Sequence, residues 1–376
     1  MPRLLTVGEA FEDLVFVGLE RLPNLGEEIR TDVFHATVGG GAVITAIGAA
    51  RLGVRTSILS ALSRAAVTQL TRDKVRVTNL RRAHERHAIT AALSTAHERT
   101  FVTFTGVNAV LEPRLLRAVP TASATHVHLA LCPKTPSAWT RVVTRLRKRG
   151  LTVSGDFGWN ETLAADADLP ALVDALDLVF LNELEAPLYA HATSLDDAFP
   201  RLRTDRSNVI VKLGEHGSRW LRSDGDVLMP APAVTAVDTT GAGDAFNAGF
   251  LASWLRGGSP AECLAVGNSV GAASTRRAGG IDGLPTSRVL PARLRHQLAG
   301  AARSSGAATR SPRKSPGAGT ATPPPRKSAS SAAATPSPRK TAGSGSSRAT
   351  SRTTPRAATA RAAARAATPS RSRRTS

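Results

Sequence analysis

Short apolar runs alternate with longer amphipathic segments through the first 300 residues of the chain. Five runs have the composition of strands buried on both faces, at residues 4–8, 125–131, 151–157, 176–182 and 208–214. Between them, apolar positions recur at helical spacing in residues 41–53, 136–150 and 169–176. Strands that alternate with helices predict an α/β fold with a mostly parallel central sheet, flanked by helices and joined by right-handed crossovers.

Two parts of the chain depart from this alternation. Residues 31–38 and 87–105 are rich in β-forming residues without helical segments of the same rhythm. We expect them to form a small additional sheet that acts as a lid. Residues 218–232 contain an Asp-Gly pair between two apolar stretches, and this pair favours a tight hairpin turn.

The C-terminal part has a different composition from the rest. Residues 301–376 contain 16 of the 49 Lys and Arg residues and no Asp or Glu, so they carry most of the formal net charge of +20. They have no aromatic residue and cannot bury enough apolar surface to offset the entropy of ordering. We therefore expect a folded domain at residues 1–297, followed by a disordered basic tail at residues 298–376.

The tail contains loose basic repeats that resemble linker-histone tails: SPRK at 311, PPRK at 324 and SPRK at 337. Such units can place cations along a phosphate backbone, which predicts salt-sensitive, non-specific association with nucleic acid and a nucleoid location. The alternative is a solvated polycation without a dedicated partner.

Cysteine content and the N-terminal sequence indicate the compartment. Cys132 and Cys263 are the only cysteines, which argues against a disulfide scaffold. The N-terminus has no signal-peptide cleavage pattern, and no run approaches the roughly 18 apolar residues needed for a membrane span. We expect a cytoplasmic protein with no membrane partner.

The stretch VDTTGAGDAFNAGF, residues 237–250, holds the strongest chemical signal. Gly241 and Gly243 leave backbone N–H groups uncovered, and a helix that begins near Ala242 adds the positive end of its dipole, so the turn suits an anion. The carboxylate of Asp244 is suited to take a proton from a hydroxyl that attacks a phosphoryl group. The alternative is an Asp that only stabilises the first helical turn.

Several segments together resemble the ribokinase-like (PfkB-type) carbohydrate kinase family. The segment DTTGAGD resembles the C-terminal motif of that family, and residues 38–53 resemble its N-terminal Gly-Gly motif. NELE at 182–185, VKLGEHG at 211–217 and VGEAFEDLV at 7–15 resemble further family segments, in the family's order. The resemblance implies a ribokinase-like fold and ATP-dependent phosphoryl transfer to a sugar or a sugar-like compound such as a nucleoside.

The resemblance also implies roles for individual residues. Asp244 corresponds to the general base, and Gly241, Ala242 and Gly243 correspond to the anion hole. The positions that correspond to nucleotide-binding residues are Asn182, Lys212, Gly214, Gly217 and Asn268. Asn182 and Glu185 correspond to residues that organise Mg²⁺ through water. Alternatives stay open for three of these features: a capped helix start for N-x-x-E, a structural Lys212 and a solvated Asn268.

On the acceptor side, Asp13, expected at the end of the first strand, resembles the carboxylate that accepts bonds from substrate hydroxyls; the alternative is an ordinary turn residue. Gly39 and Gly40 would let the backbone approach the substrate. Asp238 and Thr240 match a loop that contacts a monovalent cation in many members, which makes K⁺ an optional further ion. The resemblance is also compatible with a homodimer formed through the lid.

Two departures from the family pattern concern the acceptor side. Ile44 occupies a position where many members carry an Asn that bonds the sugar. Residues 60–70 lack the usual G-x-D-x-x-G segment. These departures keep a second hypothesis open, in which the chain is a catalytically weak or inactive binding protein that its tail tethers to nucleic acid.

Two other conspicuous groups are less informative. His126 and His128 alternate on one predicted strand without further ligands at metal-binding spacing, which favours a structural role. DFGWNE, residues 156–161, follows a predicted strand and lies where family members contact nucleotide or substrate.

Overall fold

The computed structural model describes residues 2–95, 99–203 and 208–304, and for Arg99 and residues 300–304 it describes the backbone alone. The expected disordered tail therefore lies outside the described residues from position 305 onward. The last described helix, α11 (Ala292–Ser304), continues past residue 297, where we expected the folded domain to end.

A nine-stranded sheet forms the centre of the folded unit, in the order β13-β12-β11-β10-β9-β8-β1-β4-β5. Its strands are β1 (Arg3–Gly8), β4 (Arg55–Ser60), β5 (Arg76–Asn79), β8 (His126–Ala130), β9 (Thr152–Asp156), β10 (Leu178–Asn182), β11 (Asn208–Lys212), β12 (Ser218–Leu221) and β13 (Val227–Met229). All neighbours from β11 to β5 pair in parallel. The predicted hairpin, β12 and β13, adds two antiparallel strands at one edge.

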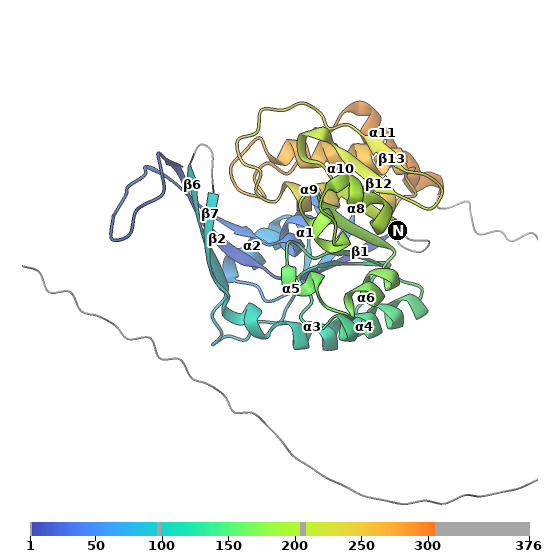
Figure 1. The fold of residues 1–376 in the computed structure, drawn as a ribbon, viewed down its shortest axis with the longest axis horizontal. Helices are drawn as coiled ribbons and strands as arrows, with labels where there is room; N and C mark the ends of the chain where they lie inside the picture. The colour runs from blue at the N-terminus through green and yellow to red at the C-terminus, as the bar shows by residue number, and fades with distance from the viewer. Residues whose placement is uncertain (1, 96–98, 204–207, 305–376) are drawn as a thin grey trace, which may run out of the picture. The chain divides into compact units, whose positions relative to one another are not determined.

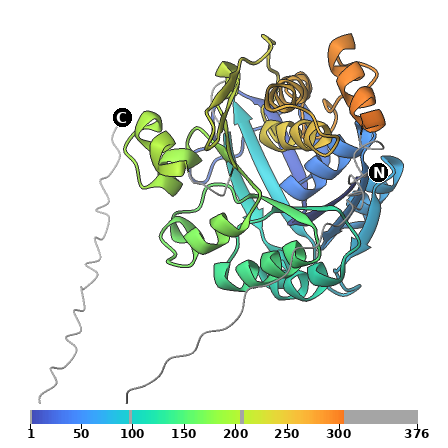
Figure 2. The same ribbon diagram turned by 90° about the vertical axis from the view of Figure 1, so that its right-hand side faces the viewer.

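Helices cover both faces of this sheet (Figures 1 and 2). One face packs against α1 (Gly41–Arg51), α2 (Arg64–Arg72), α9 (Ala242–Trp254), α10 (Pro260–Ser274) and α11. The other face packs against α3 (Glu112–Ala118), α4 (Pro136–Lys148), α6 (Leu169–Ala175), α7 (Glu185–Ala190) and α8 (Leu195–Leu202). Adjacent strand residues divide between the two cores, as Leu4 and Leu5 do, because successive side chains of a strand point to opposite faces. The predicted α/β fold is confirmed.

Short helical segments complete the connections. They are the α-helical turn α5 (Glu161–Ala164) and the 3₁₀ turns η1 (Gly106–Val110), η2 (Val119–Thr121) and η3 (Gly214–His216). Within the described residues, none of the helices combines the length and apolar character that crossing a bilayer demands.

The strand order reverses at β1. The chain moves from β1 to β4 and β5 on one side, and then returns to place β8 on the other side of β1. In an open parallel sheet, ligands bind at the carboxyl ends of the strands where the order reverses. The carboxyl ends of β1 and β8 are Gly8 and Ala130, which are register partners, and they mark the expected position of a site.

A second, four-stranded sheet projects from the helices and the large sheet in the order β3-β2-β6-β7, and we call it the lid (Figure 1). It consists of β2 (Phe11–Leu19), β3 (Val33–Gly39), β6 (Ala88–Thr95) and β7 (Arg99–Phe104). The strands β2 and β6 are parallel, while β3 and β7 pair antiparallel with their neighbours. The predicted lid regions form three of these strands, whereas β2 was not anticipated as a lid strand. Residues 96–98 of the expected region lie outside the described residues.

Candidate active site

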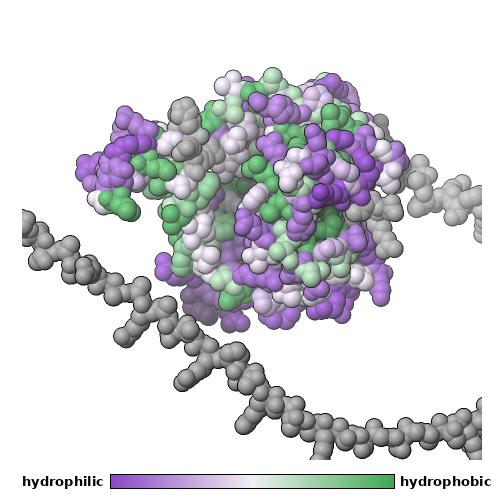
Figure 3. Space-filling model, viewed as in Figure 1, coloured by the Kyte–Doolittle hydropathy of each residue, from purple (hydrophilic) through white to green (hydrophobic). Residues whose placement is uncertain are grey.

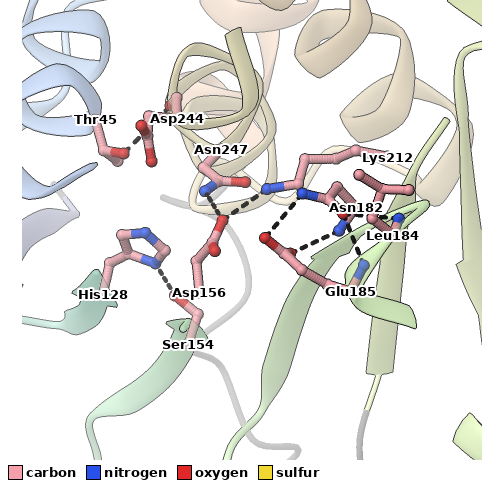
Figure 4. A network of polar contacts seen from close by, with 10 residues as sticks. All are labelled: Thr45, His128, Ser154, Asp156, Asn182, Leu184, Glu185, Lys212, Asp244 and Asn247. Atoms are coloured by element: carbon pink, nitrogen blue, oxygen red, sulfur yellow. Dashed lines mark hydrogen bonds and ion pairs between the residues drawn. The ribbon is translucent and has the colours of Figure 1, made fainter. Parts of the chain in front are cut away.

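Asp244 lies in the first turn of α9, beside the first turn of α1 (Figure 4). A Cβ atom placed on Gly41 would lie 2.7 Å from Asp244 Oδ1 and 3.2 Å from the Cβ of Ala130. Thr45 of α1 donates a hydrogen bond of 3.2 Å to the backbone oxygen of Asp244. The predicted base therefore lies where the strand order reverses, and Gly41 leaves room for its carboxylate.

The surroundings of Asp244 adjust its proton affinity. Burial raises the pKa of Asp244 to about 7; the carboxylates of Asp156 and Glu185 also raise it, and the Lys212 ammonium lowers it. A carboxylate that exchanges its proton near neutral pH is suited to general base catalysis at that pH.

The turn before α9 contains the residues predicted to form the anion hole. Gly241 has a φ of +70°, a left-handed conformation that favours glycine, and caps the helix. The backbone N–H groups of Gly241, Gly243 and Asp244 have no acceptor among the described residues, whereas the N–H of Ala242 donates to the Thr239 carbonyl at 3.2 Å. The free donors thus differ from the expected set, because Ala242 closes the turn and the Asp244 amide is available in its place.

Lys212, at the carboxyl end of β11, supplies positive charge to this turn. A Cβ on Gly243 would lie 3.1 Å from Lys212 Nζ, so the ammonium lies beside the turn. The same nitrogen forms an ion pair of 2.6 Å with Asp156 Oδ2 at the end of β9. Asn247 of α9 donates to that carboxylate oxygen at 2.7 Å. The sequence placed Asp156 within DFGWNE, in a segment that contacts nucleotide or substrate in family members, but predicted neither its ion pair with Lys212 nor any role for Asn247.

Asn182 and Glu185 satisfy each other at the start of α7. The Glu185 carboxylate accepts bonds of 2.8 Å from the backbone N–H and the side-chain amide of Asn182. In return, Asn182 Oδ1 accepts from the backbone N–H groups of Leu184 and Glu185. The pair therefore satisfies backbone N–H groups at the start of α7, as the alternative of a capped helix start predicts. Its position near Asp156 and Lys212 (Figure 4) still leaves the Mg²⁺ role a prediction.

A cavity of about 770 Å³ has Ala242 and Gly243 of the turn before α9 in its wall. Its wall contains four of the five residues predicted to bind a nucleotide, Lys212, Gly214, Gly217 and Asn268, but not Asn182. Of the predicted anion hole, Ala242 and Gly243 line the cavity and Gly241 does not. Gly214 and Gly217 have φ values of +57° and +96°, which explains glycine at both positions. Asn268 holds the end of the hairpin, because its side-chain amide donates to the carbonyls of Met229 and Pro230 at 2.8 and 3.2 Å.

Asp13 lies on the acceptor side, within the lid strand β2 and not at the end of β1 as expected from the sequence. A Cβ on Gly39 would lie 1.9 Å from Asp13 Oδ2, so Gly39 is required for this carboxylate to occupy its place. Gly40 has a φ of +98° and continues the turn into α1. Burial raises the pKa of Asp13 to about 6. Asp13 and Asp244 thus pack against successive glycines of one turn, Gly39 and Gly41.

The two departures from the family pattern have structural roles. Ile44 is 3% exposed, and its Cδ1 atom lies 2.5 and 2.6 Å from Cβ positions built on Gly241 and Gly280. Ile44 therefore packs against the turn before α9. The segment 60–70 runs from the last residue of β4 into α2, where Ser63 accepts a capping bond from the Ala66 N–H.

The residues predicted to contact a monovalent cation connect two loops. Asp238 accepts bonds from the Thr240 N–H at 2.7 Å and from the Gly279 N–H at 2.8 Å. These bonds hold the anion-binding turn to the loop before residue 280. The K⁺ role stays a prediction.

The two histidines of β8 lie in a hydrogen-bonded row under the site. His126 Nε2 and His128 Nδ1 each lie 2.8 Å from the Ser154 hydroxyl of β9. Burial lowers the pKa of His126 to about 3 and that of His128 to about 4. Both rings are therefore neutral at pH 7 and contribute hydrogen bonds and packing.

Comparisons with known proteins agree with this geometry. The family model described as pfkB family carbohydrate kinase matches residues 1–287. The chain is 33% identical over 176 residues to an ATP-dependent ribose-1-phosphate kinase of Halopiger xanaduensis, which covers 46% of this chain and 56% of that protein. It is 28% identical over 268 residues to a nucleoside kinase of Methanothermobacter thermautotrophicus, which covers 69% of this chain and 85% of that protein.

The chain thus spans little more than half the length of the first of these relatives. Among solved structures, ribokinase of Arabidopsis thaliana complexed with ribose and ATP matches with a TM-score of 0.62 and 23% identity, over 80% of this chain and 99% of that one. This likeness shows that the two chains share a fold.

The raised pKa of Asp244 has a measurable effect on stability. The folded protein holds this proton more strongly than an unfolded Asp does, so ionisation of Asp244 destabilises the fold as pH rises from about 4 to about 7. Asp244→Asn should therefore be more stable than wild type at pH 8 by about 1–4 kcal/mol, with no difference near pH 4. Urea unfolding at a series of pH values measures this.

Asp226→Asn is the matched control. Burial raises the pKa of Asp226, but Arg203 and Arg219 outweigh this effect and hold the pKa below its usual value. The Asp226→Asn variant should therefore be less stable than wild type at pH 8. Equal or lower stability of Asp244→Asn at pH 8 would contradict the unfavourable environment of its carboxylate.

Proposed function

The chain belongs to the pfkB family of carbohydrate kinases, and we propose that it transfers the γ-phosphoryl group of ATP to a hydroxyl of a sugar or sugar-like compound. The observation that carries this proposal is the position of Asp244. Its carboxylate packs against Gly41, and the turn that precedes it has backbone N–H groups without an acceptor among the described residues and contributes Ala242 and Gly243 to the wall of the 770 Å³ cavity.

Each side of the turn has its own task in the proposed reaction. The acceptor hydroxyl approaches between Asp13 and Asp244, and Asp244 takes its proton as the oxygen attacks phosphorus. The N–H groups of Gly241 and Gly243, the positive end of α9 and the Lys212 ammonium stabilise the charge that develops on the phosphoryl oxygens. Gly214 and Gly217 line the cavity that holds the nucleotide.

Mg²⁺ fits the balance of charge at this site. Asp156, Glu185 and Asp244 place three carboxylates around the single ammonium of Lys212, and a divalent cation offsets the excess negative charge that nucleotide phosphates add. We infer that Asn182 and Glu185 hold the ion through its water shell, since both oxygens of Glu185 already accept bonds from Asn182. Bound there, Mg²⁺ neutralises phosphate charge.

The names of the relatives limit the acceptor to a class. They include a ribose-1-phosphate kinase, a ribokinase and a nucleoside kinase, so free sugars, sugar phosphates and nucleosides all belong in a substrate screen. A second candidate is a family scaffold without efficient catalysis. The replacement of a sugar-bonding Asn by the buried Ile44 favours it, because an apolar side chain that supports a turn makes no bond to a sugar.

Loss of the base tests the proposed activity. A phosphoryl-transfer screen over sugars, sugar phosphates and nucleosides should find an acceptor for wild type, and Asp244→Asn should lower kcat at least ~10²-fold on it because no group takes the proton. Asp224→Asn, in the exposed turn of the hairpin, is the matched control and should keep wild-type turnover. Unchanged turnover in Asp244→Asn would remove its role as base.

We further propose that the lid forms a homodimer. By the strand register, the side of the lid opposite Asp13 carries a row of apolar side chains: Leu14, Phe16, Phe34, Ala36, Ile89, Ala91, Leu93, Val102 and Phe104. Phe34 is 50% and Val102 68% exposed, and Figure 3 shows apolar side chains on the lid. A one-sided apolar sheet face is self-complementary about a twofold axis.

Charge on this face should separate the subunits. Sedimentation at micromolar concentration should give a dimer for wild type and a monomer for the double variant Phe34→Asp/Val102→Asp, because dimer formation would bury unpaired carboxylates. Leu228→Asp, on the exposed edge strand β13, should stay dimeric. A wild-type monomer would contradict the homodimer proposal without bearing on the proposed kinase activity.

We also propose that the basic tail ties the protein to nucleic acid and hence to the nucleoid of the cytoplasm. Removal of residues after Ser304 keeps α11 whole and should abolish salt-sensitive retention on duplex DNA, since 15 of the 16 cations after residue 300 are removed with no compensating anions. Turnover should stay within about twofold of the full chain, because the residues of the site described above all precede α11. Equal DNA retention by the two proteins would refute the tether.

A further inference from the structure

Asp156 connects three elements of the site through one carboxylate oxygen. Asp156 Oδ2, at the end of β9, accepts bonds from Lys212 Nζ of β11 at 2.6 Å and from Asn247 Nδ2 of α9 at 2.7 Å (Figure 4). The Asp156 and Lys212 side chains are 11% and 13% exposed. The ammonium therefore has a fixed position that the strand and helix backbones determine.

Lys212 has three carboxylates in its surroundings and forms an ion pair with one of them. Asp156, Glu185 and Asp244 all raise the pKa of Lys212 against the effect of burial, so all three are close enough to attract it. Among the ion pairs of the described residues, it pairs with Asp156 and not with Asp244. Asn247 strengthens that preference, because its amide favours the ionised form of Asp156 and offers no bond to the other two carboxylates.

The pairing matters because the two groups have opposite tasks. An ammonium paired with Asp244 would hold that carboxylate ionised, weaken it as a base and leave the anion-binding turn. An ammonium paired with Asp156 stays beside Gly243. Buried ion pairs contribute little net stability compared with apolar replacements, so the fold alone gives weak reason for a buried ammonium here.

On this basis, which rests on the proposed kinase function, we propose that Asp156 is a positioning residue. It holds the Lys212 ammonium at the anion-binding turn and away from Asp244, so that Lys212 meets the phosphoryl charge and Asp244 stays available for the acceptor proton. Asn247 assists by orienting the Asp156 carboxylate. No covalent step is added to the reaction.

Substitutions at the two ends of the ion pair should move the pH dependence in opposite directions. The charged groups facing Asp244 are Asp156, Lys212 and Glu185; Thr45 of α1 and His128 of β8 are neutral at pH 7. Asp156→Asn removes a neighbour that raises the pKa of Asp244 and frees Lys212 to pair with it, so the pKa falls. Lys212→Met removes the neighbour that lowers this pKa, so the pKa rises.

The experiment is the pH profile of kcat/KM for the acceptor in wild type, Asp156→Asn and Lys212→Met, with folding checked by circular dichroism. The acid limb should move to lower pH in Asp156→Asn and to higher pH in Lys212→Met, and kcat should fall at least ~10-fold in both because the ammonium no longer meets the phosphoryl group. If Asp156→Asn does not fold, Asp156→Ser tests the same direction.

Asp73→Asn is the matched control. Asp73 forms a 2.7 Å ion pair with Arg51, and the two side chains are 13% and 19% exposed, close to the values at the site. Loss of this pair should leave the acid limb and kcat unchanged. An unmoved limb in Asp156→Asn, a shift in the same direction as in Lys212→Met, or an equal effect in Asp73→Asn would overturn the positioning role.

A second readout separates this inference from the proposed function. Carbon-13 NMR of aspartate carboxyls, with Asp244→Asn identifying the resonance, follows the titration of Asp244 without any turnover. If no acceptor is found, the kinase proposal fails, while opposite shifts of this titration in the two variants would still support the arrangement of Asp156, Lys212 and Asp244. Absence of those shifts would overturn it whether or not the protein is active.

Discussion

The site depends on where one ammonium group is held among several carboxylates. In the arrangement of Figure 4, Lys212 is the cation that faces Asp156, Glu185 and Asp244. In a partly buried site such charges interact more strongly than in water, so the partner of Lys212 decides the proton affinity of the others. Burial raises the pKa of Asp244 to about 7, and Lys212, which pairs with Asp156 instead, only partly offsets this. In the proposed reaction, the ion pair between Lys212 and Asp156 therefore leaves Asp244 available as the base.

The backbone places these charges together. Asp156 and Lys212 end β9 and β11, the two strands that flank β10. Asp244 lies in the first turn of α9, which meets the first turn of α1. Two glycine turns therefore face each other where the strand order reverses. Gly39 and Gly41 make room for the carboxylates of Asp13 and Asp244, and the turn before α9 presents its N–H groups. Larger residues at these glycines would displace the carboxylates.

Much of this arrangement could be predicted from the sequence because its signals are local. Buried parallel strands have apolar runs, and the GAGD turn combines glycines with a helix start and an acid. The missed features depend on tertiary contacts. The loss of the Ala242 amide to Thr239 is a detail of turn closure. The partners of Asp156 come from elements 56 and 91 residues away in sequence, and the role of Ile44 depends on its contacts with Gly241 and Gly280.

Asp13 illustrates a further limit of sequence reasoning. Only Glu9 and Ala10 separate β1 from β2, so the two strands resemble one apolar segment, although β1 belongs to the central sheet and β2 to the lid. The assignment of Asp13 to a strand end therefore failed, while its contact with Gly39 brings it to the expected turn.

In the proposed reaction, the phosphoryl and acceptor halves of the site consist of different kinds of groups. The phosphoryl side consists largely of backbone groups, glycines and one ammonium, whose geometry follows from the central sheet and α9. The acceptor side depends on side chains of the lid and of α1, where Ile44 has become a packing residue. A change of acceptor can therefore accumulate in the lid and α1 without disturbing the ion pair between Lys212 and Asp156. The chemistry is for this reason more strongly encoded in the fold than the identity of the substrate.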